Sequence, residues 1–229
     1  MQLVLYMALI IGIDDAGRGP LMGPMILAGV LLTKEQELQL KKHKIRDSKT
    51  LYHSKRIKLS KIINQSTLKQ KIVLASPTEI DSSIKKGTNL NTLEAIKTAE
   101  IINSLNNKKE KIKVIVDCPS VNIAAWKKTL MNFIDVPGNL TLYCEHKADA
   151  NHLSVSAASI LAKVEREKEV ESLKRKYGDF GSGYPSDPKT ISFLKEKGKE
   201  LSNEGIFRKS WQTWKKLFPD KEQATLSNF

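Results

Sequence analysis

Short apolar runs, separated by polar segments and one glycine-rich turn, recur along the first two thirds of the chain. Apolar runs of about four to eight residues are typical of buried strands, whereas apolar residues three and four positions apart indicate helices. The runs predict strands in the opening segment and over residues 25–32, 71–76, 112–116 and 140–144. Helical spacing predicts helices over residues 89–106 and 121–133 and from about residue 54, with residues 78–84 as a short polar turn.

The pattern changes after about residue 168. A helix continues to about Tyr177, and a loop rich in glycine and proline follows over residues 178–188. Two further helices are predicted over residues 189–197 and 206–217. The aromatic residues of the last segment are expected to form the core of a small helical region: Phe207, Trp211, Trp214 and Phe218. Its basic residues are expected to face outward and to extend a nucleic-acid-binding surface: Arg208, Lys209, Lys215 and Lys216.

The first strand ends in two adjacent carboxylates, Asp14 and Asp15, which a Gly-Arg-Gly-Pro turn follows. Adjacent residues on a regular strand point to opposite faces, so the pair can share a site only if the strand breaks between them. The glycine-rich turn can supply that break. Carboxylates beside open backbone N–H groups and a fixed cation are suited to metal-assisted phosphate chemistry. We therefore interpret this stretch as a site rather than as an ordinary acidic loop.

Composition points to a polyanionic partner. Lys and Arg number 38 against 25 Asp and Glu, which gives a net charge of +13 and a pI near 9.6. No long apolar segment accompanies this charge, which favours nucleic acid over a membrane. Two cysteines without zinc-ligand spacing indicate buried thiols in a reducing compartment. The apolar opening lacks a basic n-region, so we interpret it as a strand and expect a cytoplasmic protein.

Two more acids occupy positions where ligands bind in open α/β sheets. Asp117 ends a buried strand, although it could instead cap the following helix. Asp149 precedes a helix rich in small residues, where it could bind a ligand or act as a cap. A basic loop presents Arg46, Ser48 and Lys49, which are either phosphate contacts or exposed charges.

Two long motifs carry a resemblance to a known family. Residues 13–24, IDDAGRGPLMGP, resemble the N-terminal signature of type 2 ribonuclease H (ribonuclease HII) of the archaeal type, usually Asp-Glu-Ala-Gly-Arg-Gly-Pro. Residues 147–149, Lys-Ala-Asp, with residues 156–164, SAASILAKV, resemble its second motif. Asp-Ser-Lys at 47–49 and Val-Asp at 116–117 fit the family as well. The departure is Asp15, because the signature carries glutamate there.

The resemblance implies an α/β, ribonuclease H-like fold: a mixed central sheet with a leading antiparallel hairpin and helices on both faces. It also implies a small C-terminal helical subdomain. We expect a catalytic domain over residues 1–170, the subdomain over 171–220 and a flexible tail over 221–229.

The resemblance also implies an activity, namely hydrolysis of the RNA strand of RNA–DNA hybrids and incision at ribonucleotides embedded in duplex DNA. The expected products carry 5′-phosphate and 3′-hydroxyl ends. The implied catalytic residues and metal ligands are Asp14, Asp15, Asp117 and Asp149, which would hold two Mg²⁺ or Mn²⁺ ions about 4 Å apart. The implied substrate-binding residues are Gly17, Arg18, Gly19, Arg46, Ser48, Lys49 and Tyr184, with the Gly-Arg-Gly backbone at the 2′-hydroxyl and Tyr184 stacked beside a sugar. The Asp15 carboxylate is shorter than glutamate by one methylene, about 1.5 Å.

The last residues fit Gln-x-x-Leu-x-x-Phe through Gln223, Leu226 and Phe229, which resembles the peptide that binds sliding clamps. A frayed polar tail is the alternative. Two other functions stay open: a junction resolvase of the same superfamily, and a hybrid-binding module impaired at Asp15. We expect a monomer.

Overall fold

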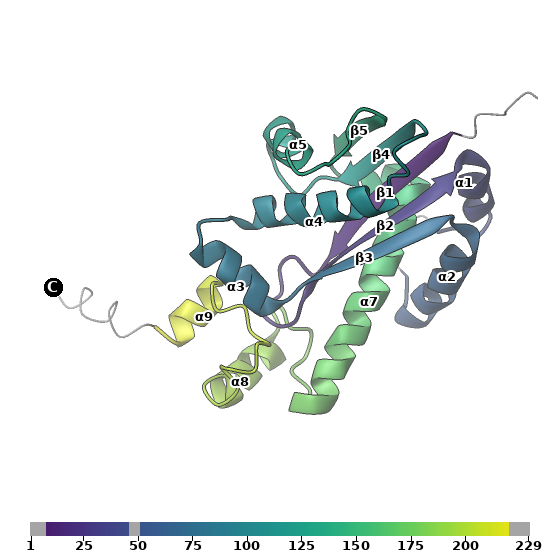
Figure 1. Ribbon diagram of the computed structural model, residues 1–229. Coiled ribbons are helices and arrows are strands. Elements are labelled where there is room, and N and C mark those ends of the chain that lie inside the picture. The colour runs from purple at the N-terminus through teal and green to yellow at the C-terminus, as the bar shows by residue number, and fades with distance from the viewer. Residues whose placement is uncertain (1–7, 46–50, 220–229) are drawn as a thin grey trace, which may run out of the picture. The chain divides into compact units, whose positions relative to one another are not determined.

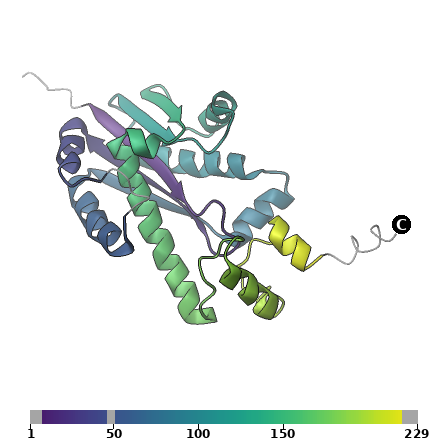
Figure 2. The same ribbon diagram turned by 180° about the vertical axis from the view of Figure 1, so that it is seen from behind.

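The computed structural model describes residues 8–45 and 51–219 (Figures 1 and 2). The strands are β1 (Leu9–Ala16), β2 (Met25–Thr33), β3 (Lys69–Ala75), β4 (Ile112–Asp117) and β5 (Leu140–Glu145). The helices are α1 (Lys34–Lys41), α2 (His53–Ser66), α3 (Pro77–Lys85), α4 (Leu90–Leu105), α5 (Ile123–Met131), α6 (Ala148–Asn151), α7 (Leu153–Tyr177), α8 (Pro188–Lys197) and α9 (Gln212–Leu217).

The strands form one mixed sheet in the order β3-β2-β1-β4-β5 (Figure 1). β1 pairs antiparallel with β2 and parallel with β4, and β4 pairs parallel with β5. The expected α/β fold with a leading antiparallel hairpin is confirmed. The five predicted strands are confirmed as well, and their bounds differ from the prediction by only one or two residues where both ends were predicted.

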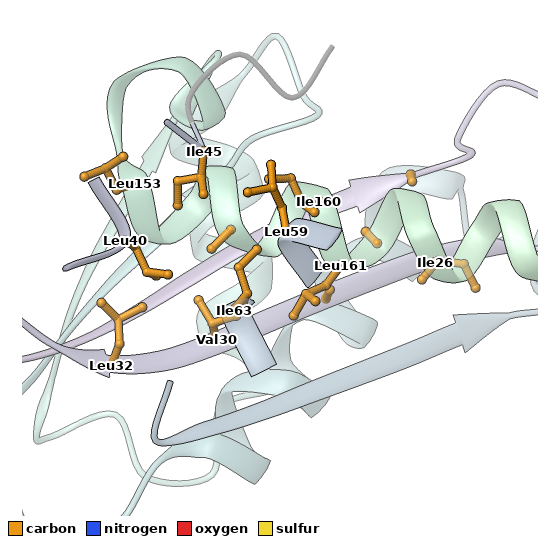
Figure 3. Packing of buried hydrophobic residues seen from close by; sticks show 14 residues of the cluster. Ile26, Val30, Leu32, Leu40, Ile45, Leu59, Ile63, Leu153, Ile160 and Leu161 are labelled. Atoms are coloured by element: carbon orange, nitrogen blue, oxygen red, sulfur yellow. The ribbon is translucent and has the colours of Figure 1, made fainter. Parts of the chain in front are cut away.

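Helices cover both faces of the sheet, as expected. α4 lies in front of the sheet in Figure 1, and the first half of α7 lies in front in the reverse view of Figure 2. On the α7 face, alternate residues of β2 pack against α1, α2 and α7 (Figure 3). The labelled members of this cluster are Ile26, Val30, Leu32, Leu40, Ile45, Leu59, Ile63, Leu153, Ile160 and Leu161.

Two glycines permit close approach of helices to the sheet. A Cβ at Gly12 would lie 2.2 Å from the carbonyl carbon of Ser154, so the backbone of α7 rests directly on β1. On the opposite face, a Cβ at Gly29 would lie 2.3 Å from Cγ2 of Ile101 in α4. Larger residues at either position would push a helix away from the strand.

The chain divides into two compact units. The first comprises the described parts of residues 1–16, 26–74 and 91–165, and the second comprises residues 17–25, 75–90 and the described part of 166–229. The second unit has its own core, in which Phe180 meets Phe193 edge-to-face at 5.8 Å and Phe207 lies 5.0 Å from Trp214. The domain bounds expected from the sequence stay a prediction.

Two predicted segments are wrong. Residues 78–84 belong to helix α3 rather than to a turn, because Ser76 caps the Glu79 N–H at 3.1 Å and Pro77 occupies the first turn. The last helix begins at Gln212 rather than at residue 206. Before it, Phe207 forms an antiparallel bridge with Met22, and a turn at Lys209 and Ser210 leads into the helix.

Within residues 8–45 and 51–219, no helix is long and apolar enough to cross a membrane. Both cysteines are free; Cys118 is buried and Cys144 is half-buried. Burial raises the pKa of the Cys144 thiol to about 12, so this thiol stays protonated.

Candidate functional site

Three of the four predicted acids line one small cavity: Asp14, Asp15 and Asp117. Strand pairing explains why they meet. The parallel pairing of β1 with β4 ends at Ile13 and Val116, so the next residue along each strand is one of these acids. Carboxyl ends of adjacent parallel strands lie at the same edge of a sheet, where open α/β sheets bind ligands.

The expected break between Asp14 and Asp15 is wrong. β1 stays paired with β2 through Asp15 and Ala16, opposite Leu27 and Ile26. Alternation along the strand therefore directs Asp14 to the α7 face, where it hydrogen-bonds Ser159, and Asp15 to the α4 face. The two carboxylates reach the cavity from opposite faces because β1 has lost its β4 neighbour at this point.

The surroundings of Asp14 disfavour the charged form of its carboxylate. Its side chain is buried, and burial raises its pKa well above the ordinary value of 3.8, with further increases from the nearby Asp15 and Asp117 carboxylates. Hydrogen bonds from Ser159 and from the Asp15 N–H, the latter at 2.8 Å, act in the opposite direction. A carboxylate held in this way among other acids is stabilised in its charged form by a bound cation.

Asp117 links the fourth acid to this group. Its Oδ1 accepts a hydrogen bond of 2.8 Å from the N–H of Ala148, the first residue of α6, and Asp149 is the next residue. The alternative that Asp117 caps the helix after β4 is wrong, because Asn122 caps α5. Asp149 is 6% exposed and lies within the one-turn helix α6 rather than just before α7.

Other polar residues at this site were not assigned a role from the sequence. Lys163 donates to the Ser159 hydroxyl at 2.9 Å, and Ser159 in turn contacts Asp14. Glu94 and Thr98 of α4 line the same cavity, and Glu94 is only 1% exposed. The sequence could have pointed to these two residues, because Glu94 and Thr98 lie four positions apart on an otherwise apolar helix face.

The acids do not form a closed set of metal ligands. In the part of the chain that the structure describes, no three His, Cys, Asp or Glu side chains are arranged so that they could hold a metal ion. The donor set nevertheless suits a hard divalent cation, because carboxylate oxygens at strand ends are the ligands that Mg²⁺ and Mn²⁺ prefer.

The second unit brings together several of the predicted substrate-binding residues. A Cβ at Gly19 would lie 3.4 Å from the Tyr184 ring, so the tyrosine packs against this turn. Arg166 lies over the same ring at 5.5 Å, and a Cβ at Gly17 would lie 2.4 Å from the Arg166 side chain. Gly17 also has φ of 84°, which L side chains rarely adopt. Arg18 is half-buried and Tyr184 is 40% exposed.

The expectation that Arg208 faces outward is wrong. Its side chain is fully buried and donates to carbonyl oxygens of residues 17–23, whereas Lys209, Lys215 and Lys216 are exposed as expected. Six other predicted residues lie outside the described part of the chain: Arg46, Ser48, Lys49, Gln223, Leu226 and Phe229.

Comparison with known proteins identifies the family. Residues 11–214 match the family model described as Ribonuclease HII. Ribonuclease HII of Methanocaldococcus jannaschii is 38% identical, covering 95% of this chain and 98% of that protein. The crystal structure of ribonuclease H2 from Pyrococcus horikoshii OT3 is 37% identical with a TM-score of 0.82, covering 91% of this chain and 96% of that one. The structure of a PCNA:RNase HII complex from Archaeoglobus fulgidus is 36% identical with a TM-score of 0.78, covering 89% and 95%. The chain therefore belongs to the ribonuclease HII family and is a metal-dependent endoribonuclease that cleaves RNA in RNA–DNA hybrids.

Proposed function

We propose that Asp14, Asp15, Asp117 and Asp149 hold two divalent cations, Mg²⁺ or Mn²⁺. We propose further that the enzyme also incises duplex DNA at single embedded ribonucleotides, with 5′-phosphate and 3′-hydroxyl products. The observation that carries this proposal is the cavity shared by Asp14, Asp15 and Asp117, with the pKa of Asp14 raised by burial and by its acidic neighbours. The contact between Asp117 and Ala148 supports including Asp149.

The protein's own contribution is to fix carboxylate oxygens before substrate arrives. Asp14 is oriented by Ser159 and by the Asp15 N–H, and Asp117 by the Ala148 N–H. Carboxylate oxygens that are already fixed in this way lose little conformational freedom when they bind a cation. Held by these carboxylates, divalent cations would supply activation of water for attack on a phosphate and stabilisation of the departing oxygen.

The proposed recognition of RNA rests on the turn at residues 17–19 and on Tyr184. Backbone groups of Gly17, Arg18 and Gly19 would read the ribose 2′-hydroxyl, the group that distinguishes RNA from DNA. Tyr184 would stack beside the neighbouring sugar, a role that its exposed ring and its contact with Gly19 support. Arg46, Ser48 and Lys49 would contact backbone phosphates, and the net charge of +13 would add sequence-independent attraction.

The decisive experiment uses a DNA duplex with one ribonucleotide. We expect incision on the 5′ side of that ribonucleotide in Mg²⁺ or Mn²⁺, with product ends identified by mass spectrometry, and no cleavage after EDTA treatment. The matched substrate replaces the ribonucleotide by a deoxynucleotide and should stay intact. Cleavage of an all-DNA four-way junction would instead indicate a resolvase, and tight hybrid binding without incision in either metal would indicate a binding module.

We also propose that the tail binds a sliding clamp through Gln223, Leu226 and Phe229. Support comes from the sequence pattern and from the 36% identical relative whose structure is a PCNA complex. Leu226 and Phe229 would act as apolar anchors, so Phe229→Ala should weaken binding to PCNA of Archaeoglobus fulgidus by roughly tenfold or more in calorimetry. Ser227→Ala is the matched control and should bind as the parent does. Equal affinity of the parent and Phe229→Ala would refute the proposal.

A cytoplasmic location is likewise our proposal. It is supported by the two free cysteine thiols and by a nucleic-acid substrate.

A further inference from the structure

The buried guanidinium of Arg208 donates hydrogen bonds to three carbonyl oxygens of the turn that precedes β2. Nη2 donates to the oxygen of Gly17 at 2.6 Å and Nη1 to that of Arg18 at 2.7 Å. The oxygen of Gly23 accepts from Nε at 3.1 Å and from Nη2 at 3.0 Å. The Arg208 side chain is 0% exposed, so these contacts satisfy a cation that water does not reach.

Trp211 extends the same arrangement by one residue. Its Nε1 donates to the oxygen of Gly19 at 3.1 Å, and the Arg208 guanidinium lies 5.0 Å from its ring centre. The carbonyl oxygens of three consecutive residues, 17 to 19, are therefore held by two side chains.

Because a peptide unit is planar, fixing its carbonyl oxygen also fixes the direction of its N–H group. In a trans peptide the C=O and the following N–H point in opposite directions. The described residues contain no cis peptide bond. With the Gly17 and Arg18 oxygens directed at Arg208, the N–H groups of Arg18 and Gly19 are directed away from it. Successive N–H groups held in this way form a donor pair for an oxygen.

The segment that carries Arg208 is itself anchored. Asp81 of α3 accepts hydrogen bonds from the N–H of Lys209 at 2.7 Å and from the N–H of Ser210 at 2.9 Å. The Arg208 N–H donates to the Leu21 oxygen at 2.9 Å. The guanidinium therefore occupies a fixed position relative to the turn.

We infer that Arg208 is a positioning residue for ribose discrimination: it fixes the Arg18 and Gly19 amides in the orientation that recognises a 2′-hydroxyl. Trp211 supports it indirectly, by packing against the guanidinium and by holding the Gly19 oxygen, because the peptide after Gly19 ends at Pro20 and has no N–H. The inference rests on the proposed function, in which this turn reads that hydroxyl. Lysine cannot replace Arg208, because an ammonium lacks the planar fork that reaches three carbonyl oxygens at once. Phenylalanine at position 211 keeps the aromatic face for Arg208 and removes only the hydrogen bond to Gly19.

The experiment measures binding selectivity rather than activity. In an Asp14→Asn background, which prevents cleavage, fluorescence anisotropy in Mg²⁺ gives the affinities for a duplex with one ribonucleotide and for the same duplex with a deoxynucleotide. Arg208→Lys should reduce the ratio of the two affinities by roughly tenfold, and Trp211→Phe by about three- to fivefold, with the all-DNA affinity unchanged. Lys215→Gln, which removes an exposed charge from the same unit, should weaken both affinities equally.

The outcomes separate the two proposals. A background protein that binds both duplexes equally would contradict the proposed reading of the 2′-hydroxyl. A background protein that discriminates, with the ratio preserved in both variants, would overturn the role of Arg208 and Trp211 alone. If Arg208→Lys does not fold, as judged by its thermal transition, Trp211→Phe decides the matter.

Discussion

Replacement of Asp14 by asparagine should abolish cleavage while making the metal-free protein more stable. In its proposed role Asp14 is an anionic metal ligand, and loss of a ligand at a site where cations supply several kcal/mol of transition-state stabilisation lowers the rate by about a thousandfold or more. The same change removes a buried charge that lies near Asp15 and Asp117, and asparagine can still accept from the Asp15 N–H. Thermal unfolding in EDTA should show a higher melting temperature, by about 2–4 °C for each kcal/mol gained.

The gain in thermal stability from Asp14→Asn should depend on pH. The pKa of Asp14 is raised in the folded state above 3.8, so ionisation penalises folding at pH values above 3.8, and the penalty disappears below that value. The advantage of Asp14→Asn should therefore be full near neutral pH and absent in strong acid. Mg²⁺ should stabilise the parent but not the variant. Asp135→Asn, at an exposed position, is the control and should change neither property. A lower melting temperature for Asp14→Asn in EDTA would contradict this account.

Lengthening Asp15 to glutamate should raise the rate in Mg²⁺ by roughly ten- to hundredfold. Displacement of a ligand by about 1 Å costs up to about a hundredfold. The structure shows no compensating bulge, because β1 keeps regular pairing through Asp15 and Ala16. The cavity beside Asp15 measures about 10 Å³, close to the smallest volume that holds one water molecule.

Comparing the rates in Mg²⁺ and Mn²⁺ separates the effect of the longer side chain in Asp15→Glu from other effects of the substitution. Mn²⁺ tolerates less regular geometry than Mg²⁺, so Asp15→Glu should increase the Mn²⁺ rate less, and the ratio of Mn²⁺ to Mg²⁺ rates should fall. Asp15→Gln has the length of glutamate without its charge and should show no gain. Single-turnover cleavage of the one-ribonucleotide duplex gives both rates. A Mg²⁺ rate for Asp15→Glu at or below that of the parent would show that this site is built around aspartate.

The sequence alone supports the sheet and the placement of the acids, because both depend on local patterns. The apolar runs that end in Asp14 and Asp117 identify strands and their carboxyl ends, and parallel strands bring such ends together. The contact of Asp117 with Ala148 joins residues 31 positions apart, and no local pattern encodes it. Alternation correctly assigned Asp14 and Asp15 to opposite faces, but the loss of β4 pairing, rather than a break, lets them share a cavity.

Arg208 shows how a sound local pattern can mislead. Phe207, Trp211, Trp214 and Phe218 have the three- and four-residue spacing of a helix face, which placed Arg208 on the solvent side. Instead, Phe207 forms a bridge with Met22 and a turn follows at Lys209 and Ser210, so residues 206–211 are not helical and Arg208 is buried. Tertiary pairing outweighs periodicity here, since residues 206–211 gain long-range hydrogen bonds that an isolated helix would not provide.

The contact of Gly12 with Ser154 has a consequence for engineering. Main chain meets main chain there, so the spacing between the strand that carries Asp14 and the helix that carries Ser159 does not depend on the size of any side chain between them. The apolar cluster of Figure 3 includes Leu153, the neighbour of Ser154, and Val30, which pairs with Gly12. Volume-conserving redesign of the cluster should therefore shift thermal tolerance while the carboxylate keeps its hydroxyl partner. We therefore expect thermal stability to vary independently of the contact between Asp14 and Ser159.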